Sequence, residues 1–396
     1  MSYVVKFAHR TDWRLDINPL MHLKEKFQRE NIAYIDLTES NPTHCGFHYP
    51  GEILSAFSKS QNLMYQPDPQ GIPKAREAVS RYYQKKGFRV EPQRIFLTAS
   101  TSEAYSFLFR LLLNPGEQVL IGQPSYPLFQ FLLDLNDAQM DRYPLLYDER
   151  GWYIDLVTLE KAIHPKTKAI VVVNPNNPTG SFLTQQDLSG ITEICQRRRL
   201  VLICDEVFSD YAFEEDPQRV LSLVDNRSIL CFCLGGISKS LGLPQMKLSW
   251  MVGTGPQDTW RDALGRLEVI ADTYLSVNAL SQNALKIWFS MKEDIENQIL
   301  RRLKQNLTFL KKAFLSLNQC CCLSPQGGWY AVVKLSPTQR EEKWAFDFLK
   351  EDHVFVHPGY FFDFPEEPYV VLSLLPKPDL FKEGVNRILN RIRRNS

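Results

Sequence analysis

The chain has 396 residues, of which 44% are apolar and 23% are charged, the composition of an ordinary globular protein with enough length for two domains. Its 46 basic and 45 acidic residues leave a net charge of +1, which gives no electrostatic reason to expect nucleic acid or an anionic membrane as a partner. No stretch approaches the roughly 20 consecutive apolar residues that a membrane helix needs.

Between about residues 45 and 285, apolar strand-like runs alternate with helical patterns, which is typical of a parallel sheet covered by helices. In chain order, the predicted elements are a helix over 72–86, a strand over 94–98, a helix over 102–113, and strands over 118–121, 169–173, 200–204, 229–234 and 247–252. A long helical tract follows, from about residue 272 to residue 314, and its second half is amphipathic.

The pattern then changes to short strands over 329–333, 354–356 and 369–374, followed by a terminal helix over 380–394. This part is typical of a smaller α+β domain. We therefore predict a large domain over residues 45–285 and a small domain formed by residues 1–44 and 286–396.

The cysteines do not predict a disulfide framework or a metal site. Four of the eight lie in or beside apolar segments, and Cys320, Cys321 and Cys322 are adjacent in sequence. Adjacent cysteines rarely satisfy disulfide geometry, and the paired CxxC pattern of zinc sites is missing. We expect no bound metal, and reduced thiols in a cytoplasmic protein.

Three of the predicted strands end in polar groups that belong together chemically. The strand over 169–173 leads into Asn174-Pro-Asn-Asn-Pro-Thr-Gly180, the strand over 200–204 into Asp205-Glu206, and the strand over 229–234 through Gly235-Gly236 to Lys239. The carboxyl ends of such strands are where open α/β sheets bind ligands. An amide, a carboxylate and an amine suit pyridoxal 5'-phosphate, which needs a lysine for its aldehyde and a carboxylate for its ring nitrogen.

Three motifs occur in a fixed order: Asn-Asn-Pro-Thr-Gly at 176–180, Asp-Glu-Val at 205–207 and Ser-Lys-Ser-Leu-Gly-Leu-Pro at 238–244. In these motifs and their order, the chain resembles the class I/II aminotransferases of fold type I, which depend on pyridoxal phosphate. The resemblance extends from about residue 36 to residue 373. It implies an α/β fold in which a large domain has a mostly parallel seven-stranded sheet and a smaller domain is α+β.

The resemblance also implies roles for the strand-end residues. Lys239 would form the Schiff base with the cofactor and, once freed, act as the general base. Asp205 would keep the pyridine nitrogen protonated, and Asn177 would donate to the phenolic oxygen and contact the substrate. Asn177 is also a typical turn residue, and the two interpretations are compatible.

Other residues would hold the ring and the phosphate. Tyr126 would stack on the ring, unless it is a core tyrosine. Ser100, Thr101 and Ser102 open a helix, so their amides and hydroxyls suit a phosphate, although serine and threonine also cap helices without any ligand. Lys247 stands where the family usually has a phosphate-binding arginine.

Two further residues bear on assembly and substrate. Tyr65 resembles a tyrosine that reaches the phosphate of the neighbouring subunit, which implies a homodimer with shared active sites. Asn41 lies in the segment that normally closes over the substrate.

Two positions depart from the family pattern. Phe208 replaces a tyrosine that donates to the phenolic oxygen, so we expect the cofactor–lysine linkage to keep its proton to higher pH, unless Tyr211 takes over that role. Val371 replaces the arginine that binds the substrate α-carboxylate, and the sequence has no arginine between Arg340 and Arg387. Either another residue binds the carboxylate, or the substrate is not an ordinary α-amino acid.

The sequence thus predicts a transaminase that moves an amino group from a small amine donor to a carbonyl acceptor in a ping-pong reaction. A β-lyase or related carbanion enzyme of the same fold would use the same lysine and aspartate, so it stays an alternative. A non-catalytic protein that binds pyridoxal phosphate is a second alternative, disfavoured because Lys239 and Asp205 are both present.

Overall fold

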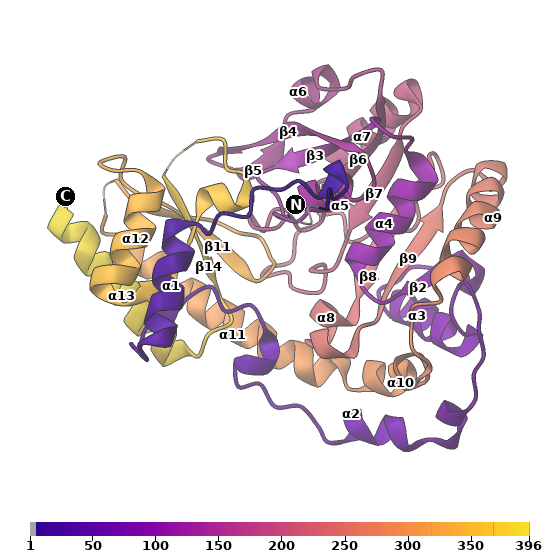
Figure 1. The fold of residues 1–396 in the computed structure, drawn as a ribbon, viewed down its shortest axis with the longest axis horizontal. Coiled ribbons are helices and arrows are strands. Elements are labelled where there is room, and N and C mark those ends of the chain that lie inside the picture. Colours follow the sequence, from indigo (N-terminus) through magenta and orange to yellow (C-terminus); the bar gives the residue numbers. More distant parts are fainter. Residues whose placement is uncertain (1–4, 318, 367, 396) are drawn as a thin grey trace.

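The computed structural model describes residues 5–317, 319–366 and 368–395, which form a large sheet and a small sheet, both flanked by helices (Figure 1). The α-helices are α1 (Pro19–Arg29), α2 (Glu52–Ser55), α3 (Pro73–Lys85), α4 (Thr101–Leu112), α5 (Phe129–Asp134), α6 (Leu156–Lys161), α7 (Gln185–Arg198), α8 (Ile237–Ser240), α9 (Gln257–Tyr274), α10 (Ala279–Ser290), α11 (Lys292–Phe314), α12 (Glu341–Asp352) and α13 (Pro378–Asn395). None of the helices in these ranges is long and apolar enough to cross a membrane.

The large sheet is mixed, with a parallel centre. In spatial order its strands are β2 (Ile95–Thr98), β9 (Ser249–Thr254), β8 (Cys231–Gly236), β7 (Val201–Asp205), β6 (Thr167–Val173), β3 (Gln118–Gln123), β4 (Gln139–Asp148) and β5 (Gly151–Ile154). The five strands from β8 to β4 are parallel, whereas β9 runs antiparallel to both of its neighbours. The α/β fold is confirmed, and β5, which folds back on β4, makes an eighth strand beside the expected seven.

Helices cover both faces of the large sheet, which explains why its central strands are continuously apolar. Neighbouring residues on one strand point to opposite faces: Ile203 packs in the layer beneath α4 and α9, while Leu202 and Cys204 pack in the other layer, which includes residues of α3 and α10. The buried cysteines of β7 and β8 belong to this second layer, and all eight cysteines are free thiols.

The small sheet contains β10 (Cys321–Leu323), β11 (Tyr330–Lys334), β14 (Tyr369–Ser373) and β13 (His357–Pro358), in this spatial order and all antiparallel. Beside it, β1 (Ile35–Asp36) pairs in parallel with β12 (Val354–Phe355), so a segment from near the N-terminus packs with the C-terminal part of the chain. The division into domains over 45–285 and over 1–44 with 286–396 stays a prediction.

The helical tract predicted from 272 to 314 is interrupted twice. Helix α9 ends at Leu275, which takes a left-handed conformation with φ 43°, and Met291 separates α10 from α11. Helical periodicity alone did not reveal these breaks, because no proline or glycine marks them.

Candidate functional site

Lys239 lies on the single turn of α8, directly after the C-terminal end of β8. The preceding Gly235 and Gly236 are required by packing: a Cβ on Gly235 would lie 2.6 Å from the Trp250 ring, and one on Gly236 would lie 2.4 Å from Ser249 Oγ. The Tyr211 hydroxyl donates a 2.6 Å hydrogen bond to the carbonyl oxygen of Lys239. The backbone that carries the lysine is therefore held from two sides.

The amine of Lys239 lies among aromatic rings. Its Nζ is 4.7 Å from the centroid of Trp329 and 5.4 Å from that of Phe208. Burial lowers its pKa to about 8, although the Asp205 carboxylate acts in the opposite direction. A lysine with this pKa supplies an appreciable fraction of neutral amine near neutral pH, which is the form that attacks a carbonyl.

This lowered pKa makes the stability of the cofactor-free protein depend on pH. Below pH 8 the folded state must hold a buried ammonium, and the resulting penalty disappears as pH rises from 8 toward the unfolded value of 10.5. We expect Lys239→Met to be more stable than the wild type at pH 7 by on the order of 3 kcal/mol, and the difference to vanish near pH 10.5. Urea unfolding of both cofactor-free proteins across this range measures it, and a pH-independent difference would contradict it.

Asp205 is the last residue of β7, in register with Val173 of β6 and Leu234 of β8. Its side chain is buried and accepts hydrogen bonds from the Tyr105 hydroxyl and the Val207 amide, both at 3.1 Å. Burial raises its pKa to about 6, against the effect of these hydrogen bonds and of Lys239. A cationic ring nitrogen beside it would favour its ionised form.

The adjacent carboxylate, Glu206, has a structural role. It accepts 2.7 Å hydrogen bonds from the Ser222 hydroxyl and from the amide of Leu223, and so fixes a neighbouring loop.

The loop after β6 uses two of its asparagines structurally and leaves the third unpaired. Asn174 bonds to the backbone of Val220 and Leu183, and Asn176 bonds to the Pro124 carbonyl and to Thr179. The buried Oδ1 of Asn177 has no hydrogen-bond partner among the described residues. Because buried polar atoms are normally paired, this oxygen is available to accept a hydrogen bond from a ligand, whereas donation to a phenolic oxygen would come from the NH2 group of the same side chain.

The loop turns back at Gly180, whose φ is +71°. A Cβ there would lie 2.4 Å from the carbonyl oxygen of Gly327, so the turn needs glycine both for its backbone conformation and for close contact with the segment after β10.

Tyr126 lies near Asp205. Burial raises its pKa to about 12, with smaller contributions from Tyr330 and Asp205. The residue is 37% exposed, so part of it can be covered by a ligand.

Helix α4 begins where the sequence predicts a phosphate site. Ser100 caps the helix by accepting a 3.1 Å hydrogen bond from the Glu103 amide, which agrees with the capping interpretation. The amides of Thr101 and Ser102 stand in the first turn, where helical amides have no partner within the helix. Tyr105, one turn further along the same helix, donates a hydrogen bond to the Asp205 carboxylate, so the start of α4 lies near Asp205.

In the part of the chain that the structure describes, three of the predicted site residues, Lys247, Tyr65 and Asn41, show no contact with the groups described so far. Lys247 is exposed, in a left-handed conformation with φ 49°, and Tyr65 is 77% exposed. Asn41 caps a short 3-10 helix through Thr43, and the neighbouring Ser40 is hydrogen-bonded to Tyr330. No contact between these three side chains and Lys239 is seen in the described chain.

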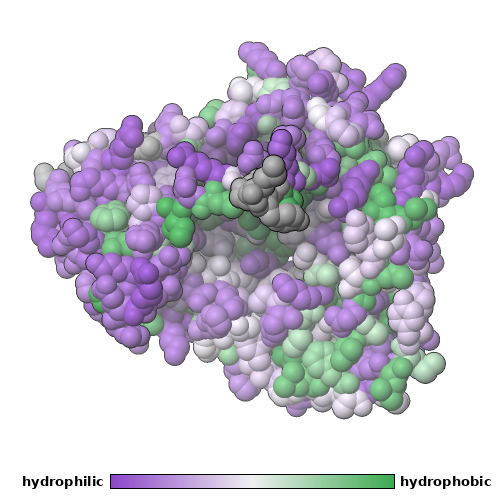
Figure 2. All heavy atoms as spheres, viewed as in Figure 1, coloured by the Kyte–Doolittle hydropathy of each residue, from purple (hydrophilic) through white to green (hydrophobic). Residues whose placement is uncertain are grey.

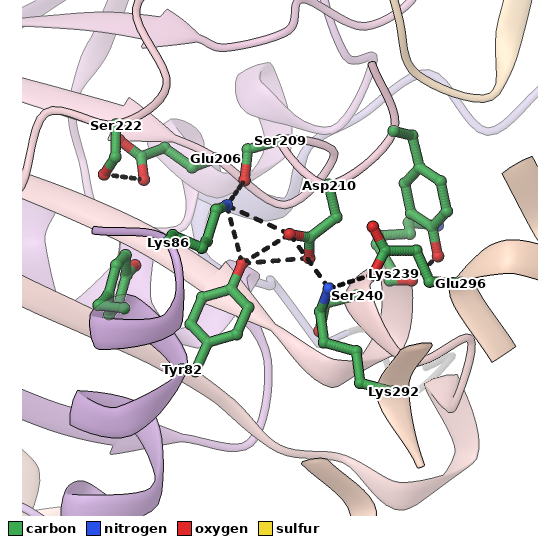
Figure 3. A network of polar contacts seen from close by, with 12 residues as sticks. Tyr82, Lys86, Glu206, Ser209, Asp210, Ser222, Lys239, Ser240, Lys292 and Glu296 are labelled. Carbon is green, nitrogen blue, oxygen red and sulfur yellow. Dashed lines mark hydrogen bonds and ion pairs between the residues drawn. The ribbon is translucent and has the colours of Figure 1, made fainter. Parts of the chain in front are cut away.

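A buried ion cluster beside the site was missed by sequence reasoning. The Asp210 carboxylate lies 3.2 Å from Lys86 Nζ and 3.3 Å from Lys292 Nζ, and Figure 3 shows the three side chains close to the turn of Lys239 and Ser240. Burial alone would raise the pKa of Asp210, but the two ammonium groups lower it below its usual value. Asp210 immediately precedes Tyr211, so the cluster anchors the loop whose tyrosine holds the Lys239 backbone.

The resemblance implies a tyrosine at the position of Phe208. Tyr211 does not supply that hydroxyl, because its own is buried and donates to the Lys239 carbonyl oxygen. We therefore expect Phe208→Tyr to lower the pH at which the cofactor–lysine linkage loses its proton by roughly one to two units, the effect of one hydrogen bond to a charged group. A pH titration of the visible absorption of both proteins measures this shift. Identical titration curves would contradict it.

Val371 is buried in an apolar cluster. It is 1% exposed and packs with Leu323, Val332, Phe362, Phe364 and Tyr369. Its cross-strand neighbour is His357, whose pKa burial lowers to about 4, so this imidazole is neutral at pH 7. Neither Val371 nor His357 therefore provides a positive charge for a substrate carboxylate.

These groups fit pyridoxal phosphate. Lys239, Asp205 and Asn177, whose amide oxygen is unpaired, follow the ends of three adjacent strands. A helix start with a partly exposed tyrosine nearby suits a phosphate and a ring.

Comparison with known proteins agrees with this chemistry. Residues 32–379 match the family model described as aminotransferase class I and II. The chain is 26% identical over 388 residues to the glutamate-pyruvate aminotransferase AlaA of Escherichia coli K12, covering 96% of this chain and 95% of that protein. It is 28% identical to an alanine aminotransferase of Mycobacterium bovis, covering 94% and 88%. The solved alanine aminotransferase of Pyrococcus furiosus superposes with a TM-score of 0.89 at 23% identity, covering 98% and 100%, which shows the shared fold.

Proposed function

This chain belongs to the class I and II aminotransferases, a family that uses pyridoxal phosphate, and we propose that its amino donor lacks a carboxylate on the reacting carbon. The observation that carries the proposal is Val371. A buried guanidinium there would pair with the α-carboxylate of an amino acid, whereas the valine side chain is enclosed by apolar residues beside a neutral histidine. A donor without that carboxylate would leave no unpaired charge beside Val371.

The bound cofactor supplies an electron sink that stabilises negative charge on the reacting carbon. The chain's own groups bind and orient it. Lys239 attaches the cofactor and, when displaced, moves a proton at the reacting carbon, for which its pKa of about 8 is suited. Asp205 would hold the ring nitrogen protonated, and Asn177 would donate to the phenolic oxygen.

The remaining residues would contact the ring face, the phosphate and the substrate. Tyr126 would cover the ring, Ser100, Thr101 and Ser102 would bind the phosphate at the start of α4, and Lys247 would add a charge to it. Asn41 contacts the substrate from the segment that carries Ser40. These roles are proposals that rest on the family resemblance together with the burial and contacts described above.

We further propose a homodimer in which Tyr65 completes the partner's phosphate site. Leu63, Met64 and Tyr65 are 88%, 64% and 77% exposed, an unusual concentration of apolar surface. Figure 2 shows hydrophobic residues gathered over α2 and α10, in the lower right of the view. Eight free cysteines support a reducing, cytoplasmic location.

The test presents the holoenzyme with two matched donors, an α-amino acid and the primary amine with the same side chain but no carboxylate. We expect the amine to convert the cofactor to its amine form in a single turnover, seen as loss of the visible absorption, much faster than the amino acid does. The reverse preference would overturn the proposal. Release of ammonia without that conversion would instead identify a lyase.

A further inference from the structure

A cavity of about 710 Å³ lies between the loop over 213–219, the outer face of α11 and the segment over 324–326. Neither Lys239 nor any other residue assigned above to the cofactor lines it. Its volume is within the range of small-molecule sites, roughly 300–1,000 Å³. It is therefore a candidate site separate from the transamination centre.

Arg219 lines this cavity and is a buried cation with no ion-pair partner among the described residues. The residue is 8% exposed, and its guanidinium lies 4.4 Å from the ring centroid of Phe182. Its Nε is buried without a hydrogen-bond partner, and in the described residues its side chain forms no ion pair. Burial lowers its pKa, with Asp216 and Glu214 acting in the opposite direction from beyond ion-pair distance.

A buried guanidinium is costly unless an anion pairs with it. Arginine stays charged, so an oxyanion that enters the cavity would supply the missing partner. The aromatic face of Phe182 orients the planar group but does not satisfy its donors, which leaves them for a ligand with oxygen acceptors.

The rest of the lining also favours an anion. Five cationic and three acidic side chains line the cavity, and one of the cations, Arg150, is already paired with Asp148, so the lining together with Asp148 carries a net charge of +1. Lys304, Lys311 and Lys312 lie on one face of α11 at helical spacing, and no ion pair involving them is seen in the described chain. The acidic groups are Glu214 and Glu215, both exposed, and Asp216, half-buried, whereas Arg219 is at the buried side.

We propose that this cavity binds the carboxylate or phosphate group of a small metabolite, with Arg219 as its anchor and the lysines of α11 at its mouth. The planar fork of a guanidinium binds either oxyanion through two parallel hydrogen bonds. The proposal concerns binding and is independent of the transamination proposed above.

The test is isothermal titration calorimetry of the holoenzyme with inorganic phosphate and, separately, with succinate, at constant ionic strength. The holoenzyme is used because the cofactor then fills its own phosphate site. We expect one site per chain for at least one probe, with no change in visible absorption. Arg219→Gln should bind at least about tenfold more weakly, whereas Arg261→Gln, which removes an exposed arginine of α9, should bind as the wild type does.

The pattern of binding identifies the ligand chemistry. A phosphate-only response points to a phosphorylated ligand and a succinate-only response to a carboxylate. Saturable binding of neither probe at millimolar concentration, or equal binding by Arg219→Gln, would overturn the proposal.

A second variant guards against misfolding of Arg219→Gln. Lys304 is exposed, so Lys304→Glu should fold normally and weaken binding, while the equally exposed Lys350→Glu on α12 should not. Unchanged affinity in Lys304→Glu would also count against the site.

Discussion

Replacing Lys239 with alanine is expected to reduce transamination by at least about 10⁴-fold, because one side chain supplies both the nucleophile and the proton carrier. The structure makes substitution from elsewhere difficult. Lys86 and Lys292, the two lysines of the ion cluster beside the turn of Lys239, are both bound to Asp210, so neither amine is free to take over. The rate of cofactor conversion in a single turnover, at a saturating donor concentration, measures the loss.

The control separates chemistry from binding. Lys239→Ala should still retain the cofactor, since Asp205, Asn177 and the start of α4 are untouched, but it should lose the visible band of the cofactor–lysine linkage. Lys343→Ala, an exposed lysine of α12, should behave as the wild type does. A retained band in Lys239→Ala would mean that another lysine carries the cofactor.

The central strands could be predicted from the sequence because they are buried on both faces and so are continuously apolar. Val201–Asp205 and Cys231–Gly236 match their predicted runs to within two residues. Strand order then places their polar ends together, which is why Lys239 and Asp205 could be paired from the amino-acid pattern alone. The eighth strand could not be counted in this way, because its burial is mixed.

The supporting contacts could not be predicted, because they join residues that are distant in sequence and have no common pattern. Tyr105 lies 100 positions from Asp205, and Lys86 and Lys292 meet Asp210 from the ends of two different helices. The spacing of Tyr105, one helical turn after Ser102, was the only local signal. The unpaired guanidinium of Arg219 likewise becomes visible only when its surroundings are known.

Asp205→Asn is expected to lower kcat by about 10²–10³-fold, the usual effect of removing one preorganised charge from a reacting centre. Asparagine has nearly the same shape: its oxygen can still accept from the Val207 amide, and its NH2 group can donate to the Tyr105 hydroxyl, which now donates to Asp205. The neutral side chain cannot hold a proton on the ring nitrogen. Rates for the amine and carbonyl half-reactions should fall together, because both need the same electron sink. Full activity in Asp205→Asn would contradict the proposal that Asp205 keeps the ring nitrogen protonated.

The pH dependence distinguishes this role from a structural one. With a pKa of about 6 in the folded protein, Asp205 becomes neutral as pH falls below 6, and its attraction for a protonated ring is then lost. Cofactor affinity of the wild type should therefore drop between pH 7 and pH 5, whereas that of Asp205→Asn should be weak and flat. Glu206→Gln is the matched control: it alters the neighbouring carboxylate, which holds Ser222 and Leu223, so it should reduce stability but keep the wild-type pH profile. If Glu206→Gln flattened the profile instead, the titrating group would be Glu206 and the assignment of Asp205 would be wrong.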